Sequence, residues 1–293
     1  MGNQRWDNTA FRDYSTRTSY QTQSTEKVFA NRNLVDGLNP SKITLRESCD
    51  SDLNPNSTPI ILGLDVTGSM GKYAHDIAVR VLPSLINNII DFSSIKDPHI
   101  MFMGIGDVRA GDSAPLQVSQ FESDIKVLES LRELFIEGGG GGNSNESYDL
   151  AWYFAANKTK IDSFDKRAQK GFLFTFGDEL PAKDALTSAQ LKRIFNNGDM
   201  KVYNSLEEQL AAAQEKYHVF HIVIEQGGGC RSGLSGIKEA WHTLLGKNAL
   251  FLKDVADLEE LIISTISIAS GTDPETIISE AKNPSALKYA YNI

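Results

Sequence analysis

The hydrophobic positions of the chain fall into two recurring patterns. Five short runs are apolar at nearly every position, which is typical of strands buried on both faces of a sheet. They cover residues 60–65, 99–106, 171–177, 218–225 and 249–252. Between them lie segments with apolar residues at steps of three or four, which predict amphipathic helices. These segments cover residues 72–89, 125–135, 145–156, 187–196, 205–216, 234–245 and 258–269.

The alternation of buried strands with helices predicts the fold class. It indicates an α/β fold with a doubly wound, mostly parallel central sheet and helices on both faces. Residues 115–121 instead alternate apolar and polar positions. This pattern predicts an antiparallel edge strand reached by a hairpin. Pro83 lies inside the first helical pattern, so we expect that helix to be kinked or split there.

Composition changes toward both ends divide the chain into three parts. Residues 1–57 are polar and lack a sustained period, so they form either a disordered arm or an extension across the domain surface. Residues 50–59 are dense in turn formers and mark a boundary. We therefore predict an N-terminal extension over 1–57, one α/β domain over 58–270, and a C-terminal tail over 271–293 with a possible short helix.

Polar side chains follow two of the predicted buried strands. Asp65, Thr67 and Ser69 come directly after residues 60–65, and Asp178 comes directly after residues 171–177. Parallel strands deliver their carboxyl ends to one edge of a sheet, so we expect these side chains to converge. A glycine-rich loop ending at Asn143 precedes the helix predicted over 145–156, and brings further oxygen atoms toward the same edge.

These side chains offer carboxylate, hydroxyl and amide oxygens, without imidazole or thiolate. Hard oxygen ligands with two or three carboxylates suit Mg²⁺ or Mn²⁺ better than Zn²⁺. Two carboxylates roughly offset the charge of the ion, and an incomplete ligand set leaves room for a carboxylate from another molecule. No base or nucleophile is evident, so the pattern favours ligand capture over an enzyme.

The motif Asp65-Val-Thr-Gly-Ser69 resembles the metal-ion-dependent adhesion site (MIDAS) of von Willebrand factor A (VWA) domains. The resemblance covers roughly residues 58–270. It implies that Thr67 and Ser69 bind the metal directly, that Asp65 binds directly or through water, and that Asp178 is the third-loop aspartate.

The second loop departs from this family pattern. VWA domains usually have Thr there, whereas this chain offers Asn143, Ser144 or Glu146 after its glycines. The stretch Gly-Gly-Gly-Asn-Ser-Asn-Glu is more similar to the variant found in intracellular VWA domains. That resemblance implies a module that recruits protein partners, often in multi-protein assemblies, through an Asp or Glu of the partner.

Other interpretations of the same residues remain open. Asp65, Thr67 and Ser69 are also residue types that cap helices, and Asn143 with Glu146 has the spacing of a capping box. The first motif also resembles the nucleophile loop of haloacid-dehalogenase-like phosphotransferases, with Asp65 as the nucleophile. Against this, Thr67 occupies the position of their usual general acid, and no cap insertion follows. A third possibility is a structural subunit of a phage or bacterial assembly.

The overall composition excludes several classes of partner. The net charge is -9, which argues against binding to nucleic acid through phosphate neutralisation. No basic block or long apolar run is present, so neither an anionic membrane surface nor a spanning helix is expected. Cys49 and Cys230 lie far apart and lack the spacing of a metal site. We expect a cytoplasmic protein with reduced thiols.

Several other polar residues are expected to be bystanders. Asp107 and Asp112 follow the second strand, and a solvated loop at the rim of the site is the default for them. His218 and His221 are three apart in a strand, so they face opposite sides and cannot share a metal. Cys230 follows three glycines and is expected to lie in a loop.

Overall fold

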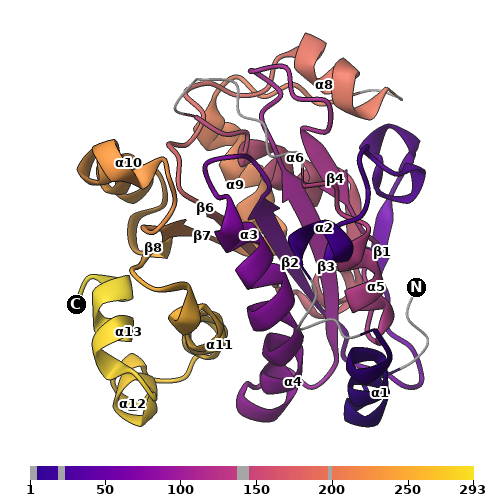
Figure 1. Cartoon of the computed structure of the whole chain (residues 1–293), viewed down its shortest axis with the longest axis vertical. Coiled ribbons are helices and arrows are strands. Elements are labelled where there is room, and N and C mark those ends of the chain that lie inside the picture. The colour runs from indigo at the N-terminus through magenta and orange to yellow at the C-terminus, as the bar shows by residue number, and fades with distance from the viewer. Residues whose placement is uncertain (1–4, 19–23, 137–144, 197–199) are drawn as a thin grey trace.

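The computed structural model describes residues 5–18, 24–136, 145–196 and 200–293. Within these ranges, six strands form a central sheet in the order β4-β3-β2-β6-β7-β8, and two short strands, β1 and β5, form a second sheet (Figure 1). The strands are β1 (Arg46–Ser48), β2 (Thr58–Asp65), β3 (Pro98–Ile105), β4 (Leu116–Val118), β5 (Thr159–Ile161), β6 (Gly171–Gly177), β7 (Tyr217–Ile224) and β8 (Ala249–Leu252).

The central sheet is parallel except at one edge. Strand β2 pairs in parallel with β3 on one side and with β6 on the other. Strands β6, β7 and β8 continue the parallel arrangement. Only β4 runs antiparallel, pairing with β3 between Val118 and Met103. The predicted fold class is therefore confirmed, including the antiparallel edge strand.

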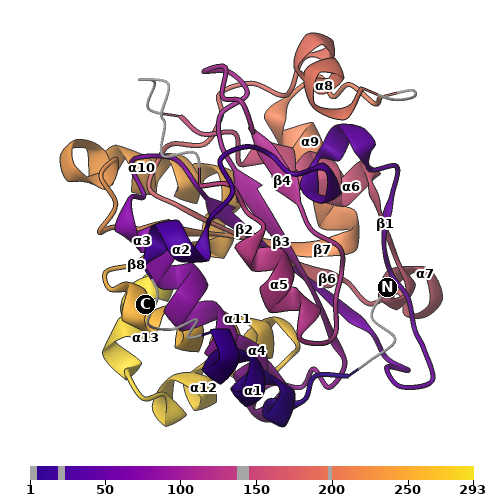
Figure 2. The same ribbon diagram turned by 45° about the vertical axis from the view of Figure 1, so that its right-hand side comes forward.

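Helices cover both faces of this sheet. One face is covered by α4, α5 and α11, and the other by α6, α9 and α10 (Figures 1 and 2). The α-helices are α1 (Asn8–Thr18), α2 (Thr25–Val28), α3 (Lys72–Asp76), α4 (Leu82–Phe92), α5 (Lys126–Arg132), α6 (Asp149–Asn157), α7 (Asp162–Arg167), α8 (Ser188–Phe195), α9 (Leu206–Lys216), α10 (Cys230–Leu245), α11 (Leu258–Ala269), α12 (Pro274–Glu280) and α13 (Pro284–Tyr291).

Strand β2 is buried on both faces, which explains why its sequence lacks an apolar–polar alternation. Ile60 and Leu62 belong to the core on the α4 and α11 side, whereas Ile61 belongs to the core on the α6 and α9 side. Successive side chains of a strand point to opposite faces, so a sheet covered on both sides requires apolar residues at every position. All three side chains are completely buried.

The helix predicted over residues 72–89 is divided. A π-helical turn, Ile77–Val81, separates α3 from α4, and Pro83 lies at the start of α4. Proline lacks the N–H that a continuous helix would need there, and a π-turn is one way to accommodate the break. The expected split is therefore present.

The described part of the N-terminal extension packs on the domain. Helix α1 lies beside α4 (Figure 2), where the Trp6 indole donates a hydrogen bond to the Asn87 side chain. Arg5 forms an ion pair with Asp97 at 2.8 Å. Strand β1 adds a parallel pairing with β5, which the sequence pattern did not predict because three residues are too few to show a period.

The C-terminal residues form two helices, α12 and α13, rather than one. Ile278 and Leu287 are buried against the core that contains α11, and the Tyr291 hydroxyl lies 2.9 Å from that of Thr265. In the described part of the chain, no helix combines the length and the apolar character that crossing a bilayer would require.

The buried state of β2 gives a direct test of this packing. We expect Leu62→Ala to lower the free energy of unfolding by about 2–5 kcal/mol, because it removes a fully buried side chain and leaves a cavity. Urea unfolding measures this value. Leu53→Ala is the matched control, since Leu53 is 55% exposed and its loss should change stability by less than about 0.5 kcal/mol. Equal effects of the two substitutions would contradict the assigned burial.

Candidate metal centre

Asp65 ends β2 and organises the loop that follows it. Its Oδ1 accepts hydrogen bonds from the amide of Thr67 at 2.9 Å and from the Thr67 hydroxyl at 2.6 Å. Its Oδ2 accepts a hydrogen bond from the hydroxyl of Tyr148 at 2.8 Å. The helix-capping interpretation is wrong, because the N-cap of α3 is Gly71 and no side chain caps it.

Asp178 follows β6 and is tied to the first loop. Its Oδ1 accepts a hydrogen bond from the Ser69 hydroxyl at 2.8 Å, and its Oδ2 accepts one from the amide of Gly229 at 2.8 Å. The hydroxyls of Thr67 and Ser69 lie 3.2 Å apart. A continuous series of oxygen contacts therefore links the carboxyl groups of Asp65 and Asp178. We call these four residues, Asp65, Thr67, Ser69 and Asp178, the candidate metal centre.

This convergence follows from the sheet register. Strands β2 and β6 are parallel neighbours, with Leu64 paired to Phe176 just before both strands end. Asp65 and Asp178 are therefore brought together at one carboxyl edge, as the sequence pattern predicted. In Figure 1 this edge lies where β2 leads into α3.

Two glycines permit the close approach of these groups. A Cβ atom on Gly177 would clash with the Tyr148 hydroxyl, and one on Gly227 would clash with the Asp178 carboxylate. Any larger residue at either position would displace the carboxylates or their hydrogen-bond donors.

The second loop is described only in part. Asn143 and Ser144, two of the three candidate ligands, lie outside the described residues. Glu146 is buried, and its Oε2 has no hydrogen-bond partner within the described structure. Helix α6 begins at Asp149, four residues later than predicted, so the proposed Asn143–Glu146 capping box is wrong.

The electrostatic environment of these carboxyl groups disfavours their ionisation. Burial, and then the neighbouring Asp178, raise the pKa of Asp65 to about 7. Burial also raises the pKa of Asp178. Burial and the charges of Asp178 and Asp65 raise the pKa of Glu179 to about 7. Burial, followed by Asp65 and other acids, raises the pKa of Glu146 to about 10.

No basic side chain offsets this charge within the described residues. None of their ion pairs includes Asp65, Asp178, Glu146 or Glu179. Arg109 is nearby, but both of its terminal nitrogens bind the Asp149 carboxylate at 2.9 Å. Buried carboxylates normally require a cation or several donors.

The donor set fits a hard divalent cation. It combines two carboxylates with two hydroxyls, and the unpartnered oxygen of Glu146 is a further buried donor atom. No group of three or more His, Cys, Asp and Glu suited to a metal is present in the described ranges. Hydroxyl donors must therefore complete any such site.

Asp107 differs from its expected place in a solvated loop. It is completely buried, and its Oδ1 accepts hydrogen bonds from the Ser147 hydroxyl at 2.7 Å and from the amide of Arg109 at 2.8 Å. The Asp112 carboxylate accepts a hydrogen bond from the Asp107 amide. These residues fold the β3–β4 connection against the second loop.

Sequence reasoning missed the aromatic support beneath the site. Tyr148 donates to Asp65, and its ring lies 4.7 Å from that of His221. His221 also stacks on Trp241 at 3.5 Å, and burial lowers its pKa well below the usual range. Trp241 donates to the Glu179 carbonyl. These contacts join residues distant in sequence, so no local pattern could have revealed them.

The prediction that Cys230 lies in a loop is wrong, because it is the first residue of α10. It is buried, and its thiol donates to the carbonyl of Asp178 at 3.4 Å. The glycines before it pack against the metal loops. The amide of Gly228, for example, donates to the Ser69 carbonyl at 2.9 Å. The helix begins four residues earlier than its apolar pattern predicted.

Comparisons with known proteins give only distant likenesses. No protein-family model matches the chain, and no curated protein matches it. Among solved structures, the pilus adhesin SpaC from Lactobacillus rhamnosus GG matches 78% of this chain and 31% of its own, with 8% identity and a TM-score of 0.49. Proximal thread matrix protein 1 from the mussel byssus matches 75% of this chain and 49% of its own, with 11% identity and a TM-score of 0.45.

Two further similar structures contain such a motif or domain. One is the mussel protein with a zinc-occupied MIDAS motif, at 11% identity and a TM-score of 0.44, covering 75% of this chain and 48% of its own. The other is a von Willebrand factor type A structure from Catenulispora acidiphila, at 14% identity and a TM-score of 0.37, covering 74% and 44%. The chain thus spans a third to a half of these proteins. None of the TM-scores reaches 0.5, so these likenesses carry no argument about function.

The raised pKa of Asp65 predicts a pH dependence of stability in metal-free protein. Because the ordinary pKa of this carboxyl is 3.8 and its folded pKa is about 7, the folded state holds the proton more tightly than the unfolded chain. The free energy of unfolding should therefore fall as pH rises between these two values. Asp65→Asn should remove part of this fall, on the order of a few kcal/mol.

Urea unfolding in EDTA at about pH 5 and about pH 8 measures the effect. Burial lowers the pKa values of His99 and His221, so these histidines make the free energy of unfolding rise with pH. They do so equally in wild type and in Asp65→Asn. The readout is therefore the difference between the pH profiles of the two proteins. Identical pH profiles for the two proteins would contradict the assigned environment of Asp65.

Proposed function

We propose that this chain is a VWA domain of the intracellular type, whose MIDAS binds Mg²⁺ or Mn²⁺ and captures an acidic residue of a protein partner. One observation carries the proposal. Two buried aspartates from adjacent parallel strands are joined through two hydroxyls, and no described basic side chain pairs with either of them. A divalent cation is the simplest species that would offset this charge.

Thr67, Ser69 and Asp178 would hold the ion, with Asp65 binding directly or through water. Glu146 is the described candidate for the second loop, because its buried carboxylate has an oxygen without a hydrogen-bond partner. When bound, the ion supplies a Lewis-acidic position for an incoming carboxylate. The hydrogen bonds from Tyr148 and Gly229 orient the two aspartates for that role.

The phosphotransferase alternative is disfavoured by the surroundings of Asp65. A nucleophilic carboxylate must reach its substrate, whereas Asp65 is completely buried and both of its oxygens accept hydrogen bonds. Thr67, at the position of the usual general acid, donates to Asp65 instead. We therefore propose a binding module without catalytic activity.

The cellular setting is also part of the proposal. The glycine-rich second loop is similar to that of intracellular VWA domains, and both cysteines are free thiols. A cytoplasmic location is consistent with these features.

Metal binding is the first test. We expect Mg²⁺ or Mn²⁺ to bind with one-to-one stoichiometry in isothermal titration calorimetry and to raise the midpoint of thermal unfolding. Ser69→Ala and Asp178→Asn should each weaken binding about 10–100-fold, because each removes an oxygen donor from the centre. Ser285→Ala and Asp52→Asn are matched controls at exposed positions. Unchanged affinity in the two site variants would refute the assignment.

Carboxylate capture is the second test. We expect peptides selected from a random library in the presence of Mg²⁺ to contain an essential Asp or Glu. Replacing that residue by Asn or Gln, or adding EDTA, should reduce binding by at least about tenfold. Peptides that bind equally well in EDTA would contradict the proposed mode of recognition. Metal binding without any metal-dependent peptide would favour the structural-subunit interpretation.

A further inference from the structure

A hollow in the surface lies at the edge of the central sheet opposite the candidate metal centre. Its volume is about 730 Å³, within the range of small-molecule sites. Thr58, Phe172 and His218, near the starts of β2, β6 and β7, line it. The other lining residues come from the loops before β2 and after α4, from α7 and the loop after it, and from the end of α11. Strand β2 begins at Thr58 beside the hollow and ends at Asp65 in the candidate metal centre, so about 20 Å separates the two sites. We call this space the amino-edge hollow.

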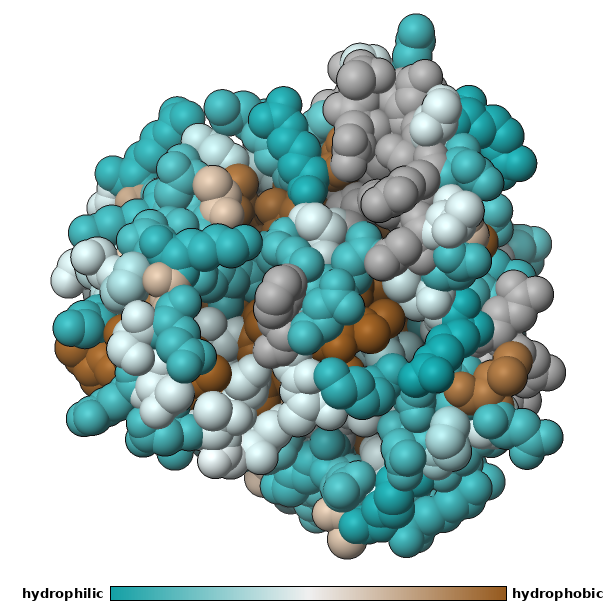
Figure 3. Space-filling view, turned by 90° about the horizontal axis from the view of Figure 1, so that it is seen from below, coloured by the Kyte–Doolittle hydropathy of each residue, from teal (hydrophilic) through white to brown (hydrophobic). Residues whose placement is uncertain are grey.

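The amino-edge hollow is basic in an acidic protein. Lys96, Arg167 and Lys170 line it, and no Asp or Glu does, whereas the whole chain has a net charge of -9. Figure 3 looks from below onto the face where the strands begin, which is largely hydrophilic with separate hydrophobic patches. A local excess of positive charge on such a protein indicates an anionic ligand.

Two carboxylates beside the lining cations are already paired. Asp50 accepts from Arg167 at 2.6 Å, and Asp97 forms its ion pair with Arg5. Lys96 and Lys170 take part in none of the ion pairs found among the described residues. Two positive charges in the hollow are therefore not offset.

A purely structural role accounts for only some of the hydrogen-bond donors of these two lysines. Lys96 donates to the carbonyls of Ile90 and Ser93 at 3.1 Å, and Lys170 donates to the carbonyl of Gln214 at 2.7 Å. These contacts stabilise the ends of α4 and α9. Each ammonium has three N–H donors, so at least one donor on each lysine remains for a ligand, and a carbonyl does not neutralise the charge.

The rest of the lining suits a ligand with several oxygen atoms and a flat or apolar part. The His218 ring stacks on Phe172 with 5.3 Å between centroids, and burial and the charge of Lys170 lower the pKa of His218. The imidazole therefore contributes a neutral surface. Neutral amide and hydroxyl groups come from Asn56, Thr58, Ser94, Gln169 and Ser270.

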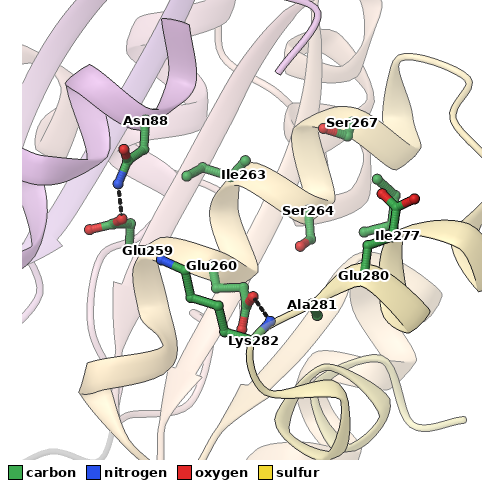
Figure 4. Close-up of a pocket in the computed structure, with 10 residues that line it drawn as sticks. All are labelled: Asn88, Glu259, Glu260, Ile263, Ser264, Ser267, Ile277, Glu280, Ala281 and Lys282. Carbon is green, nitrogen blue, oxygen red and sulfur yellow. Dashed lines mark hydrogen bonds between the residues drawn. The ribbon is translucent and has the colours of Figure 1, made fainter. Parts of the chain in front are cut away.

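A second pocket differs from the amino-edge hollow in its charge. The space between α11 and α12 has a volume of about 260 Å³ and is lined by Glu259, Glu260, Glu280 and a single cation, Lys282 (Figure 4). Glu259 accepts from Asn88, and Glu260 accepts from the amide of Lys282. This acidic pocket does not suit an anion, but Lys282 provides a matched control.

We propose that the amino-edge hollow binds a small molecule that carries a phosphate group. A phosphate monoester bears about 1.5–2 negative charges at neutral pH, which matches the two lysine charges that are not offset. Phosphate oxygens accept charge-assisted hydrogen bonds from lysine ammonium groups, and such bonds are stronger than those between neutral partners. This site is independent of the metal-dependent function proposed above.

Isothermal titration calorimetry with inorganic pyrophosphate tests the proposal. The buffer contains EDTA, so that binding through a metal at Asp65 and Asp178 cannot contribute. We expect one saturable site, with affinity weakened about tenfold by Lys96→Gln and by Lys170→Gln. Lys282→Gln removes the same charge elsewhere and should leave affinity unchanged, as should Asp65→Asn.

A second measurement needs no substitution. Pyrophosphate should shift the imidazole resonances of His218 in the unmodified protein, and those of His242 on α10 should stay in place. Absence of saturable binding, an equal loss in Lys282→Gln, or an unperturbed His218 would overturn the proposal. Displacement of pyrophosphate by a tight-binding polyglutamate peptide would also overturn it, in favour of an acidic protein segment.

Discussion

The central constraint on this protein is the close approach of two buried carboxylates at the ends of adjacent parallel strands. Like charges in a poorly hydrated environment repel, so Asp65 and Asp178 need compensation from donors or from a cation. The fold supplies the donors through the Thr67 and Ser69 hydroxyls, the Tyr148 hydroxyl and the Gly229 amide. These neutral donors fix the geometry but leave the net charge in place.

The surrounding structure serves this arrangement. Strands β2 and β6 bring the aspartates together because their register is set by a core buried on both faces. On the α6 side, the stack of Tyr148, His221 and Trp241 holds the donor to Asp65 in position. On the same side, the glycines before α10 allow its first turn to reach Asp178. The packing of the core therefore also fixes the geometry of the site.

The sequence alone predicted the sheet, its helices and the meeting of Asp65 with Asp178, because buried runs and parallel topology are local or general rules. It failed where distant contacts decide the outcome. Helix α6 starts at Asp149 because the preceding residues bind the β6 loop, as when the Asn145 side chain donates to the Pro181 carbonyl. Asp107 is buried by Ser147, and strand β1 exists only through its pairing with β5. Asn143 remains a prediction, since it lies outside the described residues.

The most direct measurement is anomalous X-ray diffraction from crystals grown with Mn²⁺. If the two aspartates are kept close in order to hold a cation, a single strong anomalous peak should lie within bonding distance of the Thr67 and Ser69 hydroxyls and of Asp178. A fully ordered structure with no peak there, and with the Ser69–Asp178 hydrogen bond intact, would contradict the account.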